Sequence, residues 1–243
     1  FKIENVKAGK YLLVAMKDAN SNNKFNPKDD KIGFRKQLVT IPNDSLFELK
    51  LFKEVLNFKT VKPFQTTGNK LILGYEGNPK NMKVVLKKGN EIIPTIVTQF
   101  PAKDSVQVWY KPIKADSLSL AVANGNYNKS YTFKKTEQKK DSLSFSPKMS
   151  LGLSKLDQFT IYSTRPLVKF DESKIKVTDK DSVIVKFTTS YDVYNQELKF
   201  DFPKEPLQSY KFQLLPGALT DYIGQKNDTL SYKVNTRNTT DYG

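Results

Sequence analysis

The chain has 243 residues, a formal net charge of +15, and neither cysteine nor histidine. Without cysteine it has no disulfides, no thiolate metal sites and no cysteine nucleophile. Without histidine it lacks the commonest general base at neutral pH and the usual zinc ligands, which excludes most enzyme classes.

The basic charge comes mainly from lysines spread along the chain, whereas arginine occurs only at Arg35, Arg165 and Arg237. Lysines on solvated strand faces and sheet edges explain this distribution, so we expect no nucleic-acid partner. No apolar run approaches the ~20 residues that a membrane helix needs. The chain opens at Phe1 inside a strand-like segment, and we therefore expect it to be part of a longer protein.

Period-two alternation of apolar residues recurs along the chain and predicts short strands with one solvent-exposed face. The alternating residues are Phe47, Leu49 and Leu51; Val106 and Val108 before Trp109; Leu118, Leu120 and Val122; Val183, Val185 and Phe187; Leu198, Phe200 and Phe202; and Tyr210, Phe212 and Leu214. Turn clusters rich in glycine, asparagine and proline separate these runs, and no amphipathic helix longer than about two turns is predicted. The predicted fold class is all-β, with tandem immunoglobulin-like β-sandwiches.

Two changes in composition divide the chain. One strand series closes near residues 53–56, and a stretch rich in lysine and acidic residues at 134–141 precedes the last series. We predict a leading segment 1–54 that is too short to be a complete domain, a sandwich at 55–145 and a second sandwich at 146–243.

The sharpest local motif is a twelve-residue loop, D-x-N-x-N-x-K-x-N-x-x-D, whose donor positions match those of calcium-binding loops. The candidate ligands are Asp18, Asn20, Asn22, Lys24 through its carbonyl, Asn26, Asp29 and the following Asp30. Position 6 is Asn23 in place of glycine, and asparagine tolerates the left-handed conformation. The alternative is an asparagine-rich turn without an ion, in which Lys24 or Lys28 neutralises the acids.

A second motif, Asp followed by Ser or Thr and an aliphatic residue, occurs six times, against roughly one expected from average residue usage. It resembles the acceptor motif for protein O-glycosylation in Bacteroidetes. The acceptors would be Ser45, Ser105, Ser117, Ser142, Ser182 and Thr229. The alternative is that Asp-Ser is a favoured turn pair and an aliphatic residue begins the next strand.

Two aromatic pairs are candidate stacking platforms for a sugar or for nucleic-acid bases: Trp109 with Tyr110, and Tyr191 with Tyr194. The alternative is core or sheet-face packing. The chain has no P-loop, G-x-S-x-G or G-x-G-x-x-G motif, and the S-x-x-K formed by Ser21 and Lys24 lies inside the asparagine-rich loop. We predict no catalytic residue and no enzyme activity.

Two stretches resemble known families. NVKAGKYLLVAMKDANSNNKFNPKDDKIGF, at residues 5–34, resembles the end of the prealbumin-like or Cna-B-like β domains of Bacteroidetes surface lipoproteins. Residues 210–234 resemble the closing strands of SbsA-type Ig-like domains, with Gly217, Asp221, Gly224 and Asn227 at their turn positions. The resemblance implies an exported lipoprotein at the outer membrane or cell surface, held by an N-terminal lipid anchor outside this chain.

Two binding functions remain open. The leading hypothesis is a non-enzymatic interaction or scaffolding module that docks or spaces protein partners in an outer-membrane assembly. The competing hypothesis is a carbohydrate- or anionic-glycan-binding protein, which requires an exposed aromatic platform around Trp109 or a contiguous lysine patch. In either case calcium would be a structural ion that stiffens the loop between YLLVAM and KIGF.

Overall fold

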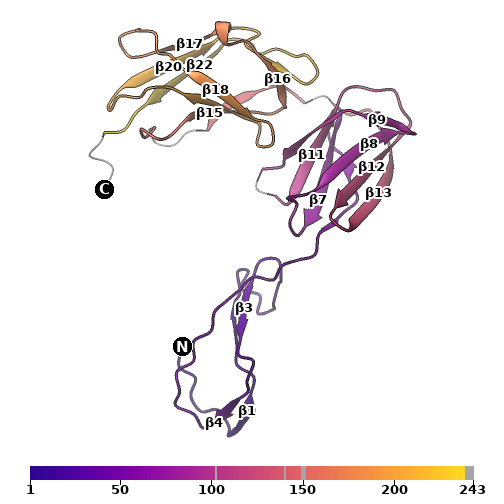
Figure 1. Ribbon diagram of the computed structural model, residues 1–243, viewed down its shortest axis with the longest axis vertical. Coiled ribbons are helices and arrows are strands. Elements are labelled where there is room, and N and C mark those ends of the chain that lie inside the picture. Colours follow the sequence, from indigo (N-terminus) through magenta and orange to yellow (C-terminus); the bar gives the residue numbers. More distant parts are fainter. Residues whose placement is uncertain (102, 140, 149–151, 239–243) are drawn as a thin grey trace. The chain divides into compact units, whose positions relative to one another are not determined.

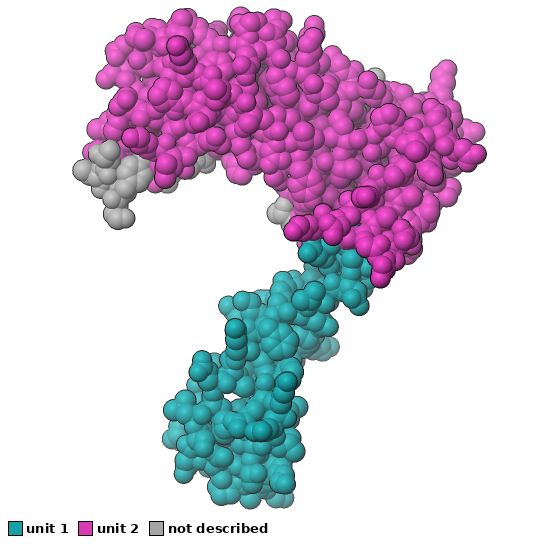
Figure 2. All heavy atoms as spheres, in the orientation of Figure 1, with its two compact units in different colours: residues 1–59, 76–79 teal, residues 60–75, 80–243 magenta. Residues whose placement is uncertain are grey.

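The computed structural model describes residues 1–101, 103–139, 141–148 and 152–238 (Figure 1). The described chain is almost entirely β-structure, as the sequence predicts, and its one helical element is the short 3-10 turn η1 (Glu172–Lys174). No helix among these residues is long and apolar enough to cross a membrane. Contacts divide the chain into two compact units, residues 1–59 with 76–79 and residues 60–75 with 80–243 (Figure 2).

The first unit contains two small antiparallel ribbons. β1 (Gly9–Tyr11) pairs with β4 (Val39–Ile41), and β2 (Val14–Lys17) pairs with β3 (Lys31–Phe34). The strand predicted at 47–52 is wrong, because this extended stretch makes only a single bridge, from Phe52 to Ile32. Alternation favours one-sided burial, but a ladder also requires a partner strand of matching length, and β3 has only four residues.

The middle sandwich has two sheets. One has the strand order β10–β11–β7–β5, with β6 also paired to β7, and the other has the order β13–β12–β8–β9. Its strands are β5 (Lys59–Thr60), β6 (Phe64–Gln65), β7 (Lys70–Glu76), β8 (Lys83–Lys88), β9 (Glu91–Ile93), β10 (Thr95–Gln99), β11 (Ser105–Tyr110), β12 (Ser117–Asn124) and β13 (Tyr127–Lys134). In chain order these sheets are A-B-E-D and G-F-C, the topology of an immunoglobulin domain with an added C′ strand.

The C-terminal sandwich has one sheet of order β14–β15–β19–β18 and a second of order β17–β20–β22, which again correspond to A-B-E-D and C-F-G. A two-stranded ribbon, β16–β21, is added to them. Its strands are β14 (Phe145–Lys148), β15 (Phe159–Ser163), β16 (Leu167–Phe170), β17 (Ile175–Thr178), β18 (Thr188–Asp192), β19 (Glu197–Asp201), β20 (Ser209–Leu214), β21 (Leu219–Asp221) and β22 (Leu230–Asn235). Phe159, Phe200 and Phe212 stack at its centre, with ring centroids 4.4 to 5.9 Å apart.

The strand predicted at 183–187 is also wrong. The Oδ1 atom of Asp179 accepts hydrogen bonds from the backbone N–H groups of Asp181 and Val183, which turns the chain back on itself. Ser182 has a left-handed φ of 64° within this turn. The following residues make one bridge, Ile184 to Thr178, and the regular strand begins only at β18.

Candidate functional site

Strand β11 is buried on both of its faces. Val106 and Val108 face the core, as their alternation predicts, and both are 0% exposed. Gln107 and Trp109 lie on the opposite face, which should be wet, yet they are only 5% and 1% exposed. The prediction of a solvent-exposed face is therefore wrong for this strand, because residues of the C-terminal sandwich cover it.

Two aromatic rings form the centre of this contact, which we call the joint. The Trp109 ring meets the Tyr222 ring edge-on, at 5.5 Å between centroids and an interplanar angle of 65°. The indole Nε1 donates a hydrogen bond to Thr98 Oγ1 at 2.8 Å. Lys70 Nζ lies 4.7 Å from the indole centroid and 3.0 Å from the Asp141 carboxylate. Such an edge-on pair contributes about 0.5–1.5 kcal/mol beyond the burial of its area.

The hairpin turn between β18 and β19 supplies the polar part of the joint. Gln196 is fully buried, accepts a hydrogen bond from Gln107 Nε2 at 3.2 Å and donates one to the Ser163 carbonyl at 3.1 Å. The Tyr194 hydroxyl donates a hydrogen bond to Gln99 Oε1 at 2.5 Å, and the Tyr194 backbone carbonyl accepts one from the Gln99 backbone N–H at 2.7 Å. A buried amide left without a partner costs about 1–3 kcal/mol, so these hydrogen bonds favour one relative position of the two sandwiches.

A buried ion pair holds the turn that carries Tyr222. Arg165 Nη1 lies 2.8 Å from Asp221 Oδ2, and the two side chains are 4% and 0% exposed. The same nitrogen donates to Gln225 Oε1 at 2.8 Å. Asp221 Oδ1 accepts the backbone N–H groups of Ile223 and Gln225. Because both partners are satisfied by further hydrogen bonds, the pair is retained without an uncompensated buried charge.

Burial changes the acidity of Tyr222 in the joint and of Tyr110 on the core side of β11. It raises the pKa of Tyr222 to about 12 and the pKa of Tyr110 to about 12. The Tyr110 hydroxyl is buried and has no hydrogen-bond partner in the described part of the chain. Both rings therefore stay neutral throughout the physiological range.

The sugar platform predicted around Trp109 is wrong, since a ring that is 1% exposed cannot stack on a ligand. The core-packing alternative holds for Trp109 and Tyr110. Tyr191 is partly buried against Phe170, and its hydroxyl accepts the Leu167 backbone N–H at 2.9 Å. Tyr194 is 42% exposed, but its hydroxyl belongs to the joint.

Backbone hydrogen bonds close the asparagine-rich loop. Asp18 Oδ2 accepts the Asn23 N–H at 2.7 Å, and Asn23 has a left-handed φ of 59°. Asp30 is fully buried and accepts the N–H groups of Ala19 at 2.9 Å and Asn26 at 2.6 Å. These bonds are the ones that an ion-free turn would make.

The loop chemistry still leaves lone pairs for a cation, because each carboxylate oxygen accepts more than one bond. Asn22 Oδ1 accepts the Lys24 N–H at 2.8 Å, whereas Asp29 is exposed. Across the described ranges, no group of three or more acidic, histidine or cysteine side chains converges to hold a metal. Calcium binding at the predicted ligands stays a prediction.

Five of the six predicted glycosylation acceptors have exposed side chains: Ser45, Ser117, Ser142, Ser182 and Thr229. The sixth, Ser105, is partly buried where β11 begins. Their placement in turns and at strand starts fits both an accessible acceptor and a plain turn pair. Glycosylation therefore also stays a prediction.

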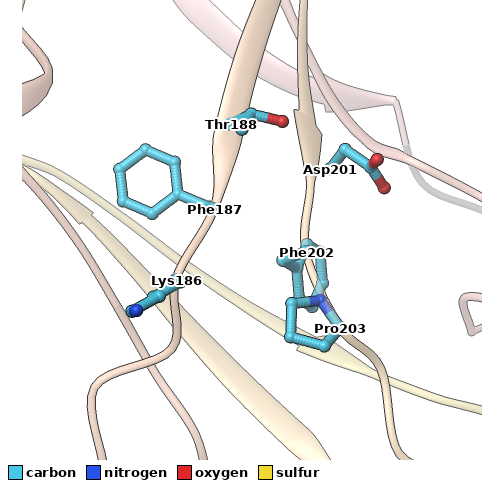
Figure 3. A pocket seen from close by; sticks show the side chains of 6 residues that line it. All are labelled: Lys186, Phe187, Thr188, Asp201, Phe202 and Pro203. Atoms are coloured by element: carbon cyan, nitrogen blue, oxygen red, sulfur yellow. The ribbon is translucent and has the colours of Figure 1, made fainter.

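Two open hollows lie on the C-terminal sandwich. The first, of about 420 Å³, lies where β18 begins and β19 ends, with Phe187 on one side and Phe202 and Pro203 on the other (Figure 3). It contains one carboxylate, Asp201, whereas acid–base chemistry on a glycosidic bond uses two.

The second hollow, of about 650 Å³, contains Asp157, Glu197 and Asp201. Glu197 pairs with Lys148 at 2.7 Å and with Lys199 at 3.4 Å. Hydrogen bonds from the backbone and side chain of Ser154 lower the pKa of Asp157, the opposite of what a general acid requires. Glu197 and Asp201 are thus ion-paired, Asp201 with Lys204 at 3.9 Å, and Asp157 caps a loop beside them.

No protein-family model and no curated protein matches this chain. Similar solved structures include immunoglobulin domains 1–4 of Sidekick-1, at 8% identity, covering 95% of this chain and 69% of that one with a TM-score of 0.30. The mouse nectin-like molecule 4 ectodomain has 9% identity, coverages of 93% and 82%, and a TM-score of 0.24. Drosophila OTK extracellular domains 3–5 have 12% identity, coverages of 86% and 69%, and a TM-score of 0.25. At such scores these likenesses carry no argument about function.

Calcium binding predicts a melting temperature that depends on the ion. We expect saturating calcium to raise the melting temperature above its value in EDTA, because an ion that binds only the folded state stabilises it. Asp18→Asn should reduce this difference, since it removes a charged ligand while keeping an oxygen acceptor. Equal melting temperatures in calcium and in EDTA would support the ion-free turn.

High pH should weaken the joint. The pKa of Tyr222, about 12 against an ordinary 10.0, means that burial of the neutral ring stabilises the folded state fully below pH 10.0. This contribution is lost as the pH rises from 10.0 to about 12. In a pH titration followed by tyrosinate absorbance, some tyrosines should ionise only above pH 10.0, and Tyr222→Phe should remove one of these late-titrating groups. A Tyr222→Phe titration that keeps every late group would contradict this assignment.

Proposed function

We propose that the chain is a non-enzymatic interaction module in which two immunoglobulin-like sandwiches form a rigid arm that spaces or docks protein partners. The observation that carries this proposal is the joint. It buries Trp109 against Tyr222 and pairs the Gln107 and Gln196 amides, so the two sandwiches make specific, satisfied contacts. A flexible tether between domains would instead have a small, polar and wet contact.

We further propose that residues 1–54 are part of a prealbumin-like β domain of an exported outer-membrane lipoprotein. One face of the β2–β3 ribbon supports this. Val14, Met16, Phe34 and Phe52 lie on that face and are 38% to 48% exposed. A complete β domain would cover such a face with further strands, because uncovered apolar sheet faces are a liability in water.

The rigid-arm proposal is tested by Tyr222→Ala. Loss of the ring should leave each sandwich folded but release their relative orientation, since Tyr222 lies outside both hydrophobic cores. Residual dipolar couplings should fit one alignment tensor in the unmodified chain and two in the variant. In an affinity pull-down from the native envelope, the unmodified protein should retain a stoichiometric outer-membrane partner and the variant should retain less.

Tyr232→Ala is the control, because Tyr232 is a partly buried tyrosine of β22 that packs on Phe159, away from the joint. It should keep a single tensor and the partner. Two tensors in the unmodified chain, or recovery of the bait alone, would contradict the proposal and favour the glycan-binding function.

If the protein is exported and O-glycosylated, sugars add mass at the six Asp-Ser/Thr motifs. We expect native protein to be heavier than the bare chain, and Ser117→Ala to remove one increment because this exposed serine begins β12. Ser119→Ala, two residues further along the same strand and outside the motif, is the control. An intact mass equal to that of the bare chain would overturn the assignment.

A further inference from the structure

The positive charge is concentrated in one folded domain. Residues 60–140 carry 14 lysines, no arginine and five acidic residues, which gives a net charge of +9. Residues 1–59 carry +5 and residues 141–243 carry +1. The middle sandwich thus holds most of the total of +15 in a third of the chain. A one-sign field of this kind raises the local concentration of anions.

One face of this sandwich is basic and open. Leu118, Leu120 and Val122 of β12 point into the core, so the alternate residues of that strand point outward. The register places three rows across β8, β12 and β13 on this outer face: Lys83–Ala123–Asn128, Val85–Ala121–Ser130 and Lys87–Ser119–Thr132. Lys134 lies beside Ser117 at the end of the same face. We call these residues the lysine face; its strands lie side by side in Figure 1.

The charges on the lysine face are spaced and uncompensated. Lys83 and Lys87 are four residues apart on one strand, which places them roughly 13 Å apart, and Lys134 lies two strands from Lys87, roughly 10 Å across the sheet. Lys83 and Lys134 are exposed and Lys87 is partly buried. The three rows contain no acidic residue, and none of the three lysines forms an ion pair with another described residue.

We propose that the lysine face binds an acidic polysaccharide, a hydroxyl-rich polymer with carboxylates or sulfates along its length. The separated lysines complement separated anionic groups, and Ser119, Ser130 and Thr132 between them both donate and accept hydrogen bonds, as sugar hydroxyls require. This inference goes beyond the rigid-arm proposal and does not depend on it.

Other polyanions fit this face less well. Single-stranded nucleic acids stack their bases on aromatic side chains, and the rows contain none. Phosphates are favoured by the bidentate fork of arginine, which residues 60–140 lack. Membrane surfaces are bound by several apolar or aromatic side chains that insert among lipids, whereas small and hydroxylated residues dominate these rows and Ile92 of β9, beside Lys87, is a single exposed apolar neighbour.

The C-terminal sandwich offers a matched control. Lys176, Lys211 and Lys233 lie on the outer face of β17, β20 and β22, in an equivalent sheet, and are exposed. The number of lysines is the same, but this part of the chain carries a net charge of only +1. Removing either triplet changes the total charge equally, so the two variants separate a local site from a general charge effect.

The test measures binding of polygalacturonate by isothermal titration calorimetry, with neutral dextran as the control polymer. The unmodified chain should bind polygalacturonate, not dextran, and binding should weaken as salt is added. The triple variant Lys83→Gln, Lys87→Gln, Lys134→Gln should bind at least about tenfold more weakly, whereas Lys176→Gln, Lys211→Gln, Lys233→Gln should stay within about twofold. The triple substitution of the first set by arginine should retain binding, because it keeps the charges.

Three results would overturn the inference. One is no binding of polygalacturonate by the unmodified chain. A second is an equal loss in both glutamine variants, which would reduce the effect to net charge. A third is tighter binding of oligo(dT) or of anionic phosphatidylserine vesicles than of polygalacturonate. Unchanged melting temperatures of all the variants establish that a loss of binding is not a loss of fold.

Discussion

The arrangement of the second unit depends on the covering of one strand face. The outer face of β11 presents a tryptophan and a glutamine, and neither is stable in its observed place without a cover. The Trp109 ring would otherwise expose a large apolar surface, and burying Gln107 requires an amide partner. Tyr222 covers the Trp109 ring, and Gln196 provides the amide partner of Gln107. One contact therefore buries the apolar ring and satisfies the polar side chain.

Two turns of the C-terminal sandwich make that cover specific. Gln196 lies in the β18–β19 turn with a left-handed φ of 57°, a conformation that a non-glycine residue adopts only when its surroundings hold it. Its amide is held by Ser163 on one side and Gln107 on the other. The second turn follows β21 and is held by the Arg165–Asp221 pair. Ser163 and the Arg165–Asp221 pair hold the two turns from within the C-terminal sandwich, which limits the entropy lost when the joint forms.

The two sheets of the middle sandwich consequently have different roles. The outer face of β10–β11–β7–β5 is used inside the chain, where its aromatic and amide groups are matched by specific partners. The outer face of β13–β12–β8–β9 remains open, and lysines, hydroxyls and small side chains dominate it, with the exposed Ile92 of β9 beside Lys87. The first composition suits a fixed protein contact, and the second suits a hydrated, charged ligand. The rigid-arm proposal rests on the first face, and the polysaccharide proposal rests on the second.

The sequence by itself determined four of the six strands predicted from alternation, β11, β12, β19 and β20, and much of the core. The alternation in β12, β19 and β20 identified Leu120, Phe200 and Phe212 as buried, because side-chain direction in a strand follows from local geometry alone. The absence of cysteine and histidine was equally decisive, since it needs no structure. The asparagine-rich loop was also found from its spacing, and Asn23 has the left-handed backbone expected there.

Only the tertiary structure decided what covers each face and which alternating segments join a ladder. Residues 47–52 and 183–187 alternate but lack a partner strand of matching length. The alternation in β11 predicts that Trp109 points away from the core, which suggested an exposed stacking platform. Whether the ring is exposed depends on residues more than 100 positions away, such as Tyr222, which covers it. The joint and the lysine face arise from register and from domain contact, and these are set by pairings between distant segments that no local pattern encodes.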